Sequence, residues 1–290
     1  MRLLLVALCT MYSQYVAPQV NDSLASRKWL VSGGIGITSA TSLVLLNELW
    51  YSDYEKSPLH SFNDADEWFQ IDKAGHLTTN YYLTSLLHPV LKWSGYSDRS
   101  ALYTGAAISL GYQTTIEIMD GLSAQWGFSW TDQLANTLGA FAYSGQHLLW
   151  NEQRIRFKFS YSPTDFANIR PELLGRNYTQ RILKDYNGQI YWISVNPSSF
   201  MKDDTWFPSW LNVAAGYGGE GMISALDNSF NGITYDRYRQ YYLSFDIDLT
   251  RIKWKNKWLK SMSTVFSLIK VPLPTVEFAV NRNLEFFIVK

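Results

Sequence analysis

The stretch from Trp68 to Tyr82, WFQIDKAGHLTTNYY, holds the residues best suited to chemistry. Asp72, His76 and Asn80 recur every four residues, so on a helix they lie along one face. A histidine beside a carboxylate can act as an acid–base pair, and the same two residues could equally form a satisfied pair in a core. Lys73 could either neutralise nearby acids or extend its ammonium group to a membrane surface.

The other candidates come from two later predicted helices. The segment IEIMDG places Glu117 and Asp120 at the C-terminal end of a helix, where the helix dipole disfavours negative charge unless a cation is near. The segment SWTDQLANTLGA places Asp132 and Asn136 one turn apart at the start of the next helix, with Gly139 almost one turn further. Buried charged groups need partners, so we expect the three helices to bring these groups together.

Two interpretations of this expected cluster stay open. In the first it is catalytic or metal-binding, since a carboxylate and an imidazole can exchange protons and together also suit Zn, Mn or Fe. In the second it is structural, with Ser129 and Asp132 as a capping box, Asn136 bonding neighbouring helices and Gly139 as a packing notch. The candidate catalytic residues are Asp72, His76, Glu117 and Asp132, and the candidate binding residues are Lys73, Asn80, Asp120, Asn136 and Gly139.

The sequence predicts no cofactor. It contains no HExxH, GxSxG or phosphate-binding glycine loop, and His60, His88 and His147 lack the spacing of metal ligands. The glycines of Gly216–Gly221 follow a strand-like run with no predicted helix after them, which argues against a nucleotide site. A divalent metal at the expected cluster is supported by residue type alone.

Four segments poor in charge are predicted to be helices. Each has about twenty residues, so each spans about 30 Å, the thickness of bilayer hydrocarbon. Tryptophans stand at the ends of three of them, as in the aromatic belts of membrane proteins. We predict a membrane-embedded or membrane-docked four-helix bundle, with a soluble bundle as the alternative. The segments are Trp29–Trp50, Trp68–Trp93, the stretch that follows Ser97 and runs to Met119, and Trp130–Trp150.

Local signals predict where these helices begin and end. Asp64 and Glu67 match a capping box ahead of the second helix. Pro89 is expected to kink or end that helix, because proline lacks the backbone N–H and clashes with the preceding turn. Gly121 is expected to act as the C-terminal cap of the third helix.

Residues 151–290 are predicted to be rich in strands. In RIRFKFSYS (154–162) and YYLSFDIDLTRI (241–252), apolar side chains alternate with polar ones, so each strand has an apolar and a polar face. We predict about six strands, a C-terminal hairpin around Asn281–Asn283 and an amphipathic helix near 257–270. A closed outer-membrane barrel needs at least about eight strands. We therefore predict a sheet packed on helices or a partial membrane-facing sheet.

Composition limits the classes of function. The formal net charge of the 290 residues is zero, which argues against a nucleic-acid partner. Charged residues are 17% and aromatic residues 16%, which favours contact with lipid, while a mean hydropathy of −0.15 is too low for a chain embedded throughout. Residues 1–19 are typical of a signal peptide, with a buried strand as the alternative. Its Cys9 follows Leu8, not the small residue that lipid attachment requires.

The segments DKAGH, IEIMDG and SWTDQLANTLGA resemble the YfiM-like family of predicted periplasmic lipoproteins. They are also distantly similar to VanZ-like membrane proteins, which share an Asp-Lys-x-x-His helix and an Asp-x-x-x-Asn-x-x-Gly helix. The resemblance covers roughly Trp68 to Tyr143 and implies a location in the cell envelope, but no activity. The matching positions are Asp72, Lys73, His76, Glu117, Asp120, Asp132, Asn136 and Gly139.

We therefore predict an α+β protein of the bacterial cell envelope, exported and membrane-associated on the periplasmic side, with the inner and outer membranes both open. Its expected organisation is a signal peptide (1–19), a helical bundle with the polar cluster (27–150) and an aromatic-rich antiparallel β region (151–290). The expected partners are a lipid bilayer and lipid or glycan head groups. The expected function is structural or lipid- or glycan-binding; the alternative is a membrane-bound hydrolase or transferase that acts by acid–base chemistry on a lipid-linked or cell-wall substrate.

Overall fold

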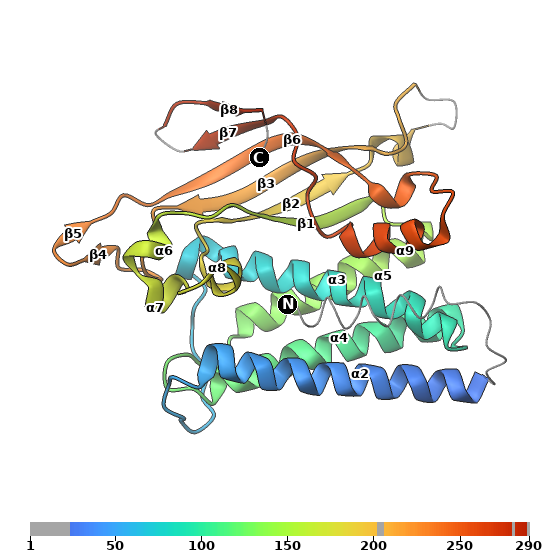
Figure 1. Ribbon diagram of the computed structural model, residues 1–290, viewed down its shortest axis with the longest axis horizontal. Helices are drawn as coiled ribbons and strands as arrows, with labels where there is room; N and C mark the ends of the chain where they lie inside the picture. The colour runs from blue at the N-terminus through green and yellow to red at the C-terminus, as the bar shows by residue number, and fades with distance from the viewer. Residues whose placement is uncertain (1–23, 202–205, 280–281, 289–290) are drawn as a thin grey trace. The chain divides into compact units, whose positions relative to one another are not determined.

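The computed structural model describes residues 24–201, 206–279 and 282–288 (Figure 1). It is a mixture of helices and antiparallel strands, which confirms the predicted α+β class. The chain forms two compact units that are interleaved in sequence. The helical unit comprises the described residues up to Asp64 together with Thr79–Glu152 and Lys253–Val265, and the sheet unit comprises Ala65–Thr78, Gln153–Ile252 and the described residues from Phe266 onward. The predicted signal peptide, 1–19, lies outside the described residues.

The helical unit is built on four long helices, all at or near the predicted positions (Figure 1). Helix α3 is shared, since its residues 71–78 belong to the sheet unit. The hydroxyl of Tyr82 on α3 donates a hydrogen bond to the carbonyl of Val265 at the end of the short helix α9. The helices are α2 (Leu24–Leu46, continued by the π-helical turn Asn47–Tyr51), α3 (Ile71–Trp93), α4 (Asp98–Gly121), α5 (Trp130–Trp150) and α9 (Lys257–Phe266).

Serine side chains cap the starts of α4 and α5. The hydroxyl of Ser97 accepts a hydrogen bond from the backbone N–H of Ser100, and that of Ser129 accepts one from Asp132. Gly121 belongs to the last turn of α4 and is not the residue that follows it, so the predicted glycine cap is wrong. Glycine is needed there for close packing, because a Cβ would lie 2.6 Å from Cδ1 of Leu59.

The start of α3 differs from the predicted capping box. Three consecutive residues, Trp68–Gln70, have positive φ angles of 47°, 53° and 63°, and the α-helix begins only at Ile71. Asp64 lies seven residues before Ile71, too far along the chain to cap α3, and its Oδ1 accepts hydrogen bonds from the hydroxyls of Ser129 and Thr131. Pro89 does not end α3, which continues to Trp93.

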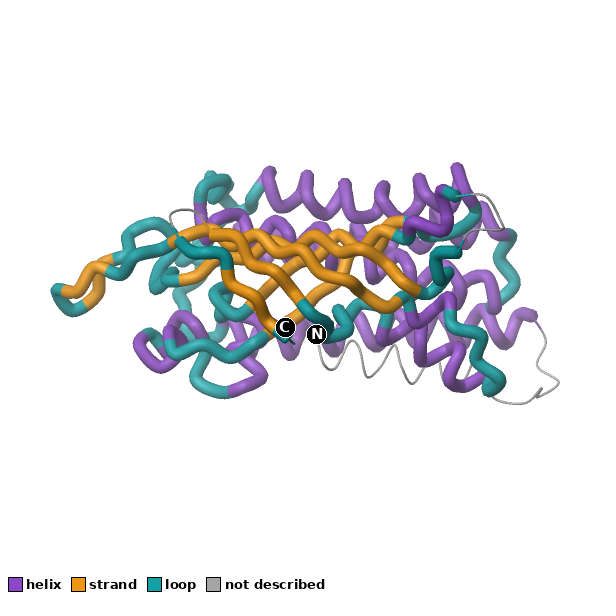
Figure 2. The backbone as a smooth tube through the Cα atoms, turned by 90° about the horizontal axis from the view of Figure 1, so that it is seen from above, coloured by secondary structure: helices purple, strands orange, loops and turns teal. Residues whose placement is uncertain are grey.

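The sheet unit contains a six-stranded antiparallel meander, close to the predicted strand count (Figures 1 and 2). Its order is β1-β2-β3-β6-β7-β8, and a separate hairpin joins β4 to β5. The pairing of β7 with β8 confirms the C-terminal hairpin. The strands are β1 (Ile155–Tyr161), β2 (Gln189–Val195), β3 (Leu211–Glu220), β4 (Ser229–Phe230), β5 (Ile233–Thr234), β6 (Tyr238–Ile247), β7 (Thr275–Ala279) and β8 (Glu285–Phe287); the short helices are α6 (Phe166–Ile169), α7 (Pro171–Leu174) and α8 (Tyr178–Lys184).

The sheet is strongly curled. Lys158 on β1 and Asp246 on β6 form an ion pair of 2.6 Å between Nζ and Oδ2, although β2 and β3 lie between their strands. Neighbouring strands are about 4.8 Å apart, so a flat sheet would hold these two backbones about 14 Å apart, too far for the pair. The polar face is therefore on the inside of the curl. Small residues on β3 make room there, since a Cβ at Gly216 would lie 2.7 Å from the Trp192 ring.

Candidate functional site

The structure divides the predicted polar cluster between the two units. The sheet unit holds Asp72, Lys73 and His76 in the first turns of α3. The helical unit holds Asn80 on α3, Glu117 and Asp120 on α4, and Asp132, Asn136 and Gly139 on α5. The meeting of these two groups stays a prediction. The same holds for a divalent metal bound by Asp72, His76, Glu117 and Asp132.

Asp72 is the centre of the group in the sheet unit. Its Oδ1 accepts a hydrogen bond of 2.9 Å from the hydroxyl of Tyr186 and lies 3.7 Å from Nε2 of His76. The ammonium of Lys73 lies 3.4 Å from its other oxygen. The predicted proximity of Asp72, Lys73 and His76 is thus observed. Their partner Tyr186 comes from a distant turn of the chain and is not evident from the sequence.

The left-handed turn before α3 is tied to the sheet. The Phe69 ring lies between two guanidinium groups, with its centroid 4.4 Å from Arg237 and 4.5 Å from Arg239. The carbonyl of Phe69 accepts hydrogen bonds from the hydroxyl of Tyr217 (2.5 Å) and from Arg239 (3.1 Å). The Trp68 ring packs on Tyr186 at 5.0 Å between centroids. These contacts offset the cost of left-handed backbone at non-glycine residues, about 1–2 kcal/mol each, and position the residues that follow.

In the helical unit, the predicted residues form a buried amide network. The amide of Asn80 donates to the backbone carbonyl of Asn136 (2.6 Å), and the amide of Gln113 donates to Oδ1 of Asn136 (3.0 Å). Asn136 in turn donates to the carboxylate of Glu117 at 3.5 Å, and Glu117 is only 1% exposed. The network therefore links α3, α4 and α5 through neutral groups and a single acid.

The remaining predicted residues of this unit have local partners. The carboxylate of Asp120 accepts a hydrogen bond of 2.8 Å from the hydroxyl of Tyr51. Asp132 and Gly139 are buried on α5, and the backbone N–H of Asp132 donates to its capping residue, Ser129. These contacts are those of helix ends and helix packing.

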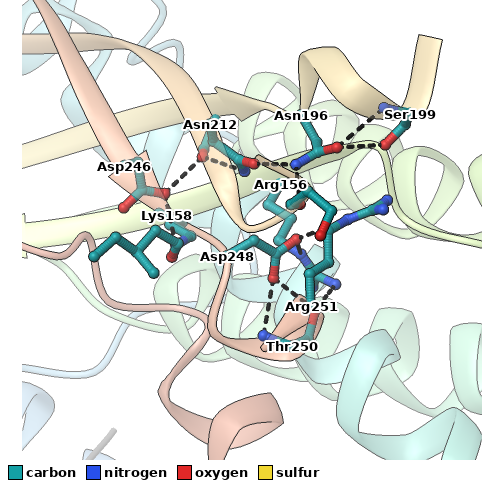
Figure 3. A network of polar contacts seen from close by, with 12 residues as sticks. Arg156, Lys158, Asn196, Ser199, Asn212, Asp246, Asp248, Thr250 and Arg251 are labelled. Carbon is teal, nitrogen blue, oxygen red and sulfur yellow. Dashed lines mark hydrogen bonds and ion pairs between the residues drawn. The ribbon is translucent and has the colours of Figure 1, made fainter. Parts of the chain in front are cut away.

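A second polar network lies in the sheet unit and is not evident from the sequence (Figure 3). Lys158 and Asp246 are fully buried; Lys158 also donates to the carbonyl of Ile247 (2.9 Å), and Asp246 accepts from the hydroxyl of Ser194 (2.6 Å). Burial lowers the pKa of the Lys158 ammonium, despite the opposing effect of Asp246. The alternation of charge on 154–158 and 244–248 is visible in the sequence, but the side of the sheet that is buried is not.

A second buried ion pair, between Arg156 and Asp248, extends this network. Arg156 lies 2.9 Å from Asp248, and Arg251 lies 3.4 Å from the same carboxylate oxygen (Figure 3). Burial alone would raise the pKa of Asp248, but Arg156 and the hydroxyl of Thr250 hold it below its ordinary value. Nearby, the amide of Asn196 donates to Asn212 (2.7 Å), so the polar network continues into neutral groups.

A cavity of about 440 Å³ opens at one end of the polar face of the sheet. Its lining is mainly polar and includes Thr164, Asn187, Glu220, Gln240 and Tyr242. The amide of Gln240 donates 2.8 Å hydrogen bonds to Glu220 and to Glu277. Binding of a lipid or glycan head group, expected from the sequence, stays a prediction for which this cavity offers hydrogen-bonding groups.

The opposite face of the sheet is apolar. Strand register aligns Phe157, Ile193, Ala215, Leu243, Val276 and Phe286 in one row across all six strands. Six side chains on this side are 45–64% exposed, and together we call them the outer face. They are Ile193, Tyr241, Leu243, Phe245, Phe278 and Phe286. Within the described strands, Arg239, at one end, is the only charged residue of this side.

The helical unit also exposes apolar side chains. The helix Leu24–Tyr51 is long and apolar enough to cross a membrane, by length and composition, and only 11% of its most apolar window is buried. On α5, Trp130, Phe141 and Leu149 are exposed, while the amide and carboxylate groups described above point inward.

Comparison with known proteins gives one match. Residues 61–145 match the model of a family described as predicted periplasmic lipoprotein (DUF2279). The match covers the start of α3 through most of α5, including every predicted site residue. The chain matches no curated protein and no solved structure. The family match and the apolar helix Leu24–Tyr51 both fit an exported, envelope-associated protein.

Proposed function

We propose that this protein is a structural, membrane-associated component of the cell envelope, and that its sheet unit rests on a lipid bilayer by its outer face. The observation that carries the proposal is the inverted polarity of the sheet. The ion pairs of Lys158 with Asp246 and of Arg156 with Asp248 lie on the inner side of the curl. The opposite side carries Leu243, Phe245 and other exposed apolar residues. In a water-soluble sheet, polar residues would cover this side.

The distribution of residue types along the strands supports lipid as the occupant. Aliphatic side chains and Phe245 fill the middle of the outer side. Toward one end, Phe159 of β1 aligns with the tyrosines Tyr191, Tyr217 and Tyr241 of β2, β3 and β6. Trp206 and Trp210, both exposed, lie near the other end, before β3. The six steps from Tyr241 to Ile247 span about 20 Å, close to the apolar band of membrane-facing sheets, which aromatic residues flank at both edges.

A label on the outer face tests this proposal. In a Cys9→Ser background, Phe245→Cys is labelled with the environment-sensitive dye NBD and mixed with phosphatidylethanolamine–phosphatidylglycerol vesicles. We expect the dye emission to shift to shorter wavelength and to be quenched by lipids that carry a nitroxide on the acyl chain. Ser229→Cys, on the exposed β4–β5 hairpin, is the matched control and should respond to neither.

The same experiment separates lipid from other occupants. Emission that is already blue-shifted without vesicles, and that nitroxide lipids do not quench, would mean that protein covers Phe245 and would overturn the proposal. A shift that grows with protein concentration in the absence of lipid would assign the outer face to a second copy of the chain. The alternative function, a hydrolase or transferase that uses His76 and Glu117, stays a prediction.

A further inference from the structure

We propose that His88, Asp98 and His147, in the helical unit, form a binding site for a divalent transition metal, Zn²⁺ in the first place. This site is separate from the outer face of the sheet and from the residues predicted to carry chemistry. Two imidazoles and one carboxylate are a common ligand set for Zn²⁺, and three protein ligands leave a coordination position for water.

Three different helices supply the ligands. His88 lies in the last turns of α3, Asp98 is the first residue of α4, and His147 is in the last turn of α5. Because the three residues are far apart in sequence, the ligand spacing that reveals many zinc sites cannot be seen here. The turn after α3 and the Ser97 cap fix the place of Asp98 beside the two histidines.

The distances suit a metal after small side-chain movements. Nε2 of His88 lies 3.5 Å from Oδ1 of Asp98, and Nε2 of His147 lies 2.7 Å from Oδ2. One ligand atom of each residue lies within 4.8 Å of those of the other two. Bonds of about 2.0–2.2 Å to a tetrahedral zinc ion place ligand atoms roughly 3.4 Å apart. Rotation of the half-exposed Asp98 carboxylate would move its oxygen from the His147 hydrogen bond to that separation.

The environment of His88 points to a ligand. Its Nδ1 lies 3.1 Å from the hydroxyl of Tyr143, an outer contact of the kind that orients metal-binding imidazoles. This contact turns Nε2 toward Asp98 and His147, whose ring lies 4.5 Å from that of His88 between centroids. His88 is 4% exposed, and its Nε2 makes no hydrogen bond within the described part of the chain. Its nearest acceptor, Oδ1 of Asp98, lies 3.5 Å away, too far for a strong hydrogen bond, so an ion that replaces this weak contact would satisfy the buried nitrogen.

Lys92 lies on the solvent-exposed side of this site. Its ammonium lies 2.5 Å from Oδ1 of Asp98, and both side chains are well exposed. A lysine with this much freedom can leave when a doubly charged ion arrives, so the Lys92–Asp98 pair competes with the metal and does not block it. The competing explanation is a charge network of His147, Lys92 and Asp98 that needs no metal.

Zinc binding to the full-length protein tests the proposal. The protein is purified in detergent, treated with a chelator and titrated with Zn²⁺ against a chromophoric competitor. We expect the His88–Asp98–His147 site to bind one equivalent and to raise the melting temperature, because the ion joins three helices. The Co²⁺ form should show the visible absorption of a four-coordinate site with nitrogen and oxygen ligands.

Matched variants assign the binding to these residues. His88→Gln, His147→Gln and Asp98→Asn should each weaken Zn²⁺ binding at least about tenfold and abolish the rise in melting temperature. His60→Gln, which changes an exposed histidine of the same unit, should have no effect, and Lys92→Met should bind at least as tightly as the original chain. His76→Gln measures any separate binding beside Asp72.

Two results would overturn the inference. The first is an original protein that binds no Zn²⁺ beyond the amount removed by His76→Gln. The second is affinity unchanged in both His88→Gln and His147→Gln. Variants that do not fold are recognised from their circular dichroism, and the titration of the original protein then decides alone.

Discussion

The helical unit and the sheet unit both bury polar side chains and expose apolar ones, but they satisfy the buried groups differently. In the helical unit, Asn80, Gln113 and Asn136 bond to one another and to a single acid, Glu117. The inner side of the sheet instead holds full charges of both signs, in the ion pairs shown in Figure 3.

This difference follows from geometry. Neighbouring helices bring short amides within hydrogen-bond distance, so neutral groups are enough to join α3, α4 and α5. The curl of the sheet brings together side chains from strands that are not neighbours, so that Ser194 on β2 and the longer Lys158 on β1 both reach Asp246 on β6. The two units should therefore respond differently to the loss of one buried group: the helical unit loses a hydrogen bond, and the sheet unit is left with an unpaired charge.

The largest effect is expected for Lys158→Met. This change removes the cation in direct contact with the buried Asp246 carboxylate, which should lower the free energy of unfolding by about 3–5 kcal/mol. Thermal or urea unfolding in detergent measures it. The control is Glu172→Gln, which removes the partner of Arg170 in a surface pair and should cost less than about 1 kcal/mol. A loss equal to that of the control would mean that the ion pair of Lys158 and Asp246 does not stabilise the curled sheet.

A second effect of the buried charges is a dependence of stability on pH. Burial lowers the pKa of Lys270 from 10.5 to about 8, although Asp246 acts in the opposite direction. Between these two values the unfolded chain binds more protons than the folded chain, so stability should rise with pH from about 8 to 10.5, by roughly 3 kcal/mol. Below pH 8 the full cost of the buried ammonium is present. The measurement is the difference in unfolding free energy between the original protein and Lys270→Met, followed from pH 7 to 10.5. Taking this difference separates the contribution of Lys270 from that of tyrosines, which also titrate near pH 10 in both proteins.

If that difference stayed constant over this range, Lys270 would have an ordinary pKa in the folded protein. Water would then reach its ammonium group, which lies 3.1 Å from Ser244 Oγ and 4.9 Å from the centre of the Trp192 ring, and would stabilise the charge there. The sheet unit would resemble the helical unit more than its ion pairs suggest.

Local features of both units could be predicted from the sequence, because they depend on neighbouring residues. Ser129 caps α5 as one interpretation of the sequence predicted, and the alternation in 154–162 and 241–252 corresponds to real strands. The start of α3 could not be predicted in this way. Its left-handed turn depends on Arg237, Arg239 and Tyr217, which reach Phe69 from distant strands.

The ion-pair network inside the sheet and the site of His88 and His147 could not be predicted either, because both depend on contacts between residues far apart in sequence. Alternation predicts two faces for β1 and β6 but not which face is buried, since the curl that encloses Lys158 arises from the pairing of six strands. In the same way, His88 and His147 meet because α3 and α5 pack together, not because of their spacing. For the candidate site, the sequence identified Asp72 with its neighbours and Asn136 with Glu117, but not their partners Tyr186 and Gln113.

The smallest of these effects on stability should come from the amide network of the helical unit. Asn136→Ala removes the acceptor of Gln113 and the donor to Glu117, and it leaves those groups buried, so we expect a loss of about 1–3 kcal/mol. Thr137→Ala, the next residue on α5, is the control. Among the residues that the structure describes, its hydroxyl bonds only within the helix, to the carbonyl of Gln133, so its loss should stay within about 0.5 kcal/mol.

The two units can then be compared on one scale. If Asn136→Ala costs as much as Lys158→Met, then Glu117 carries a charge that depends on Asn136, and the helical unit shares the ionic character of the sheet. If it costs no more than Thr137→Ala, the amides of Gln113 and Asn136 find other partners, and the three helices are joined by packing alone. Only an intermediate loss supports the distinction between a neutral network in one unit and a charged one in the other.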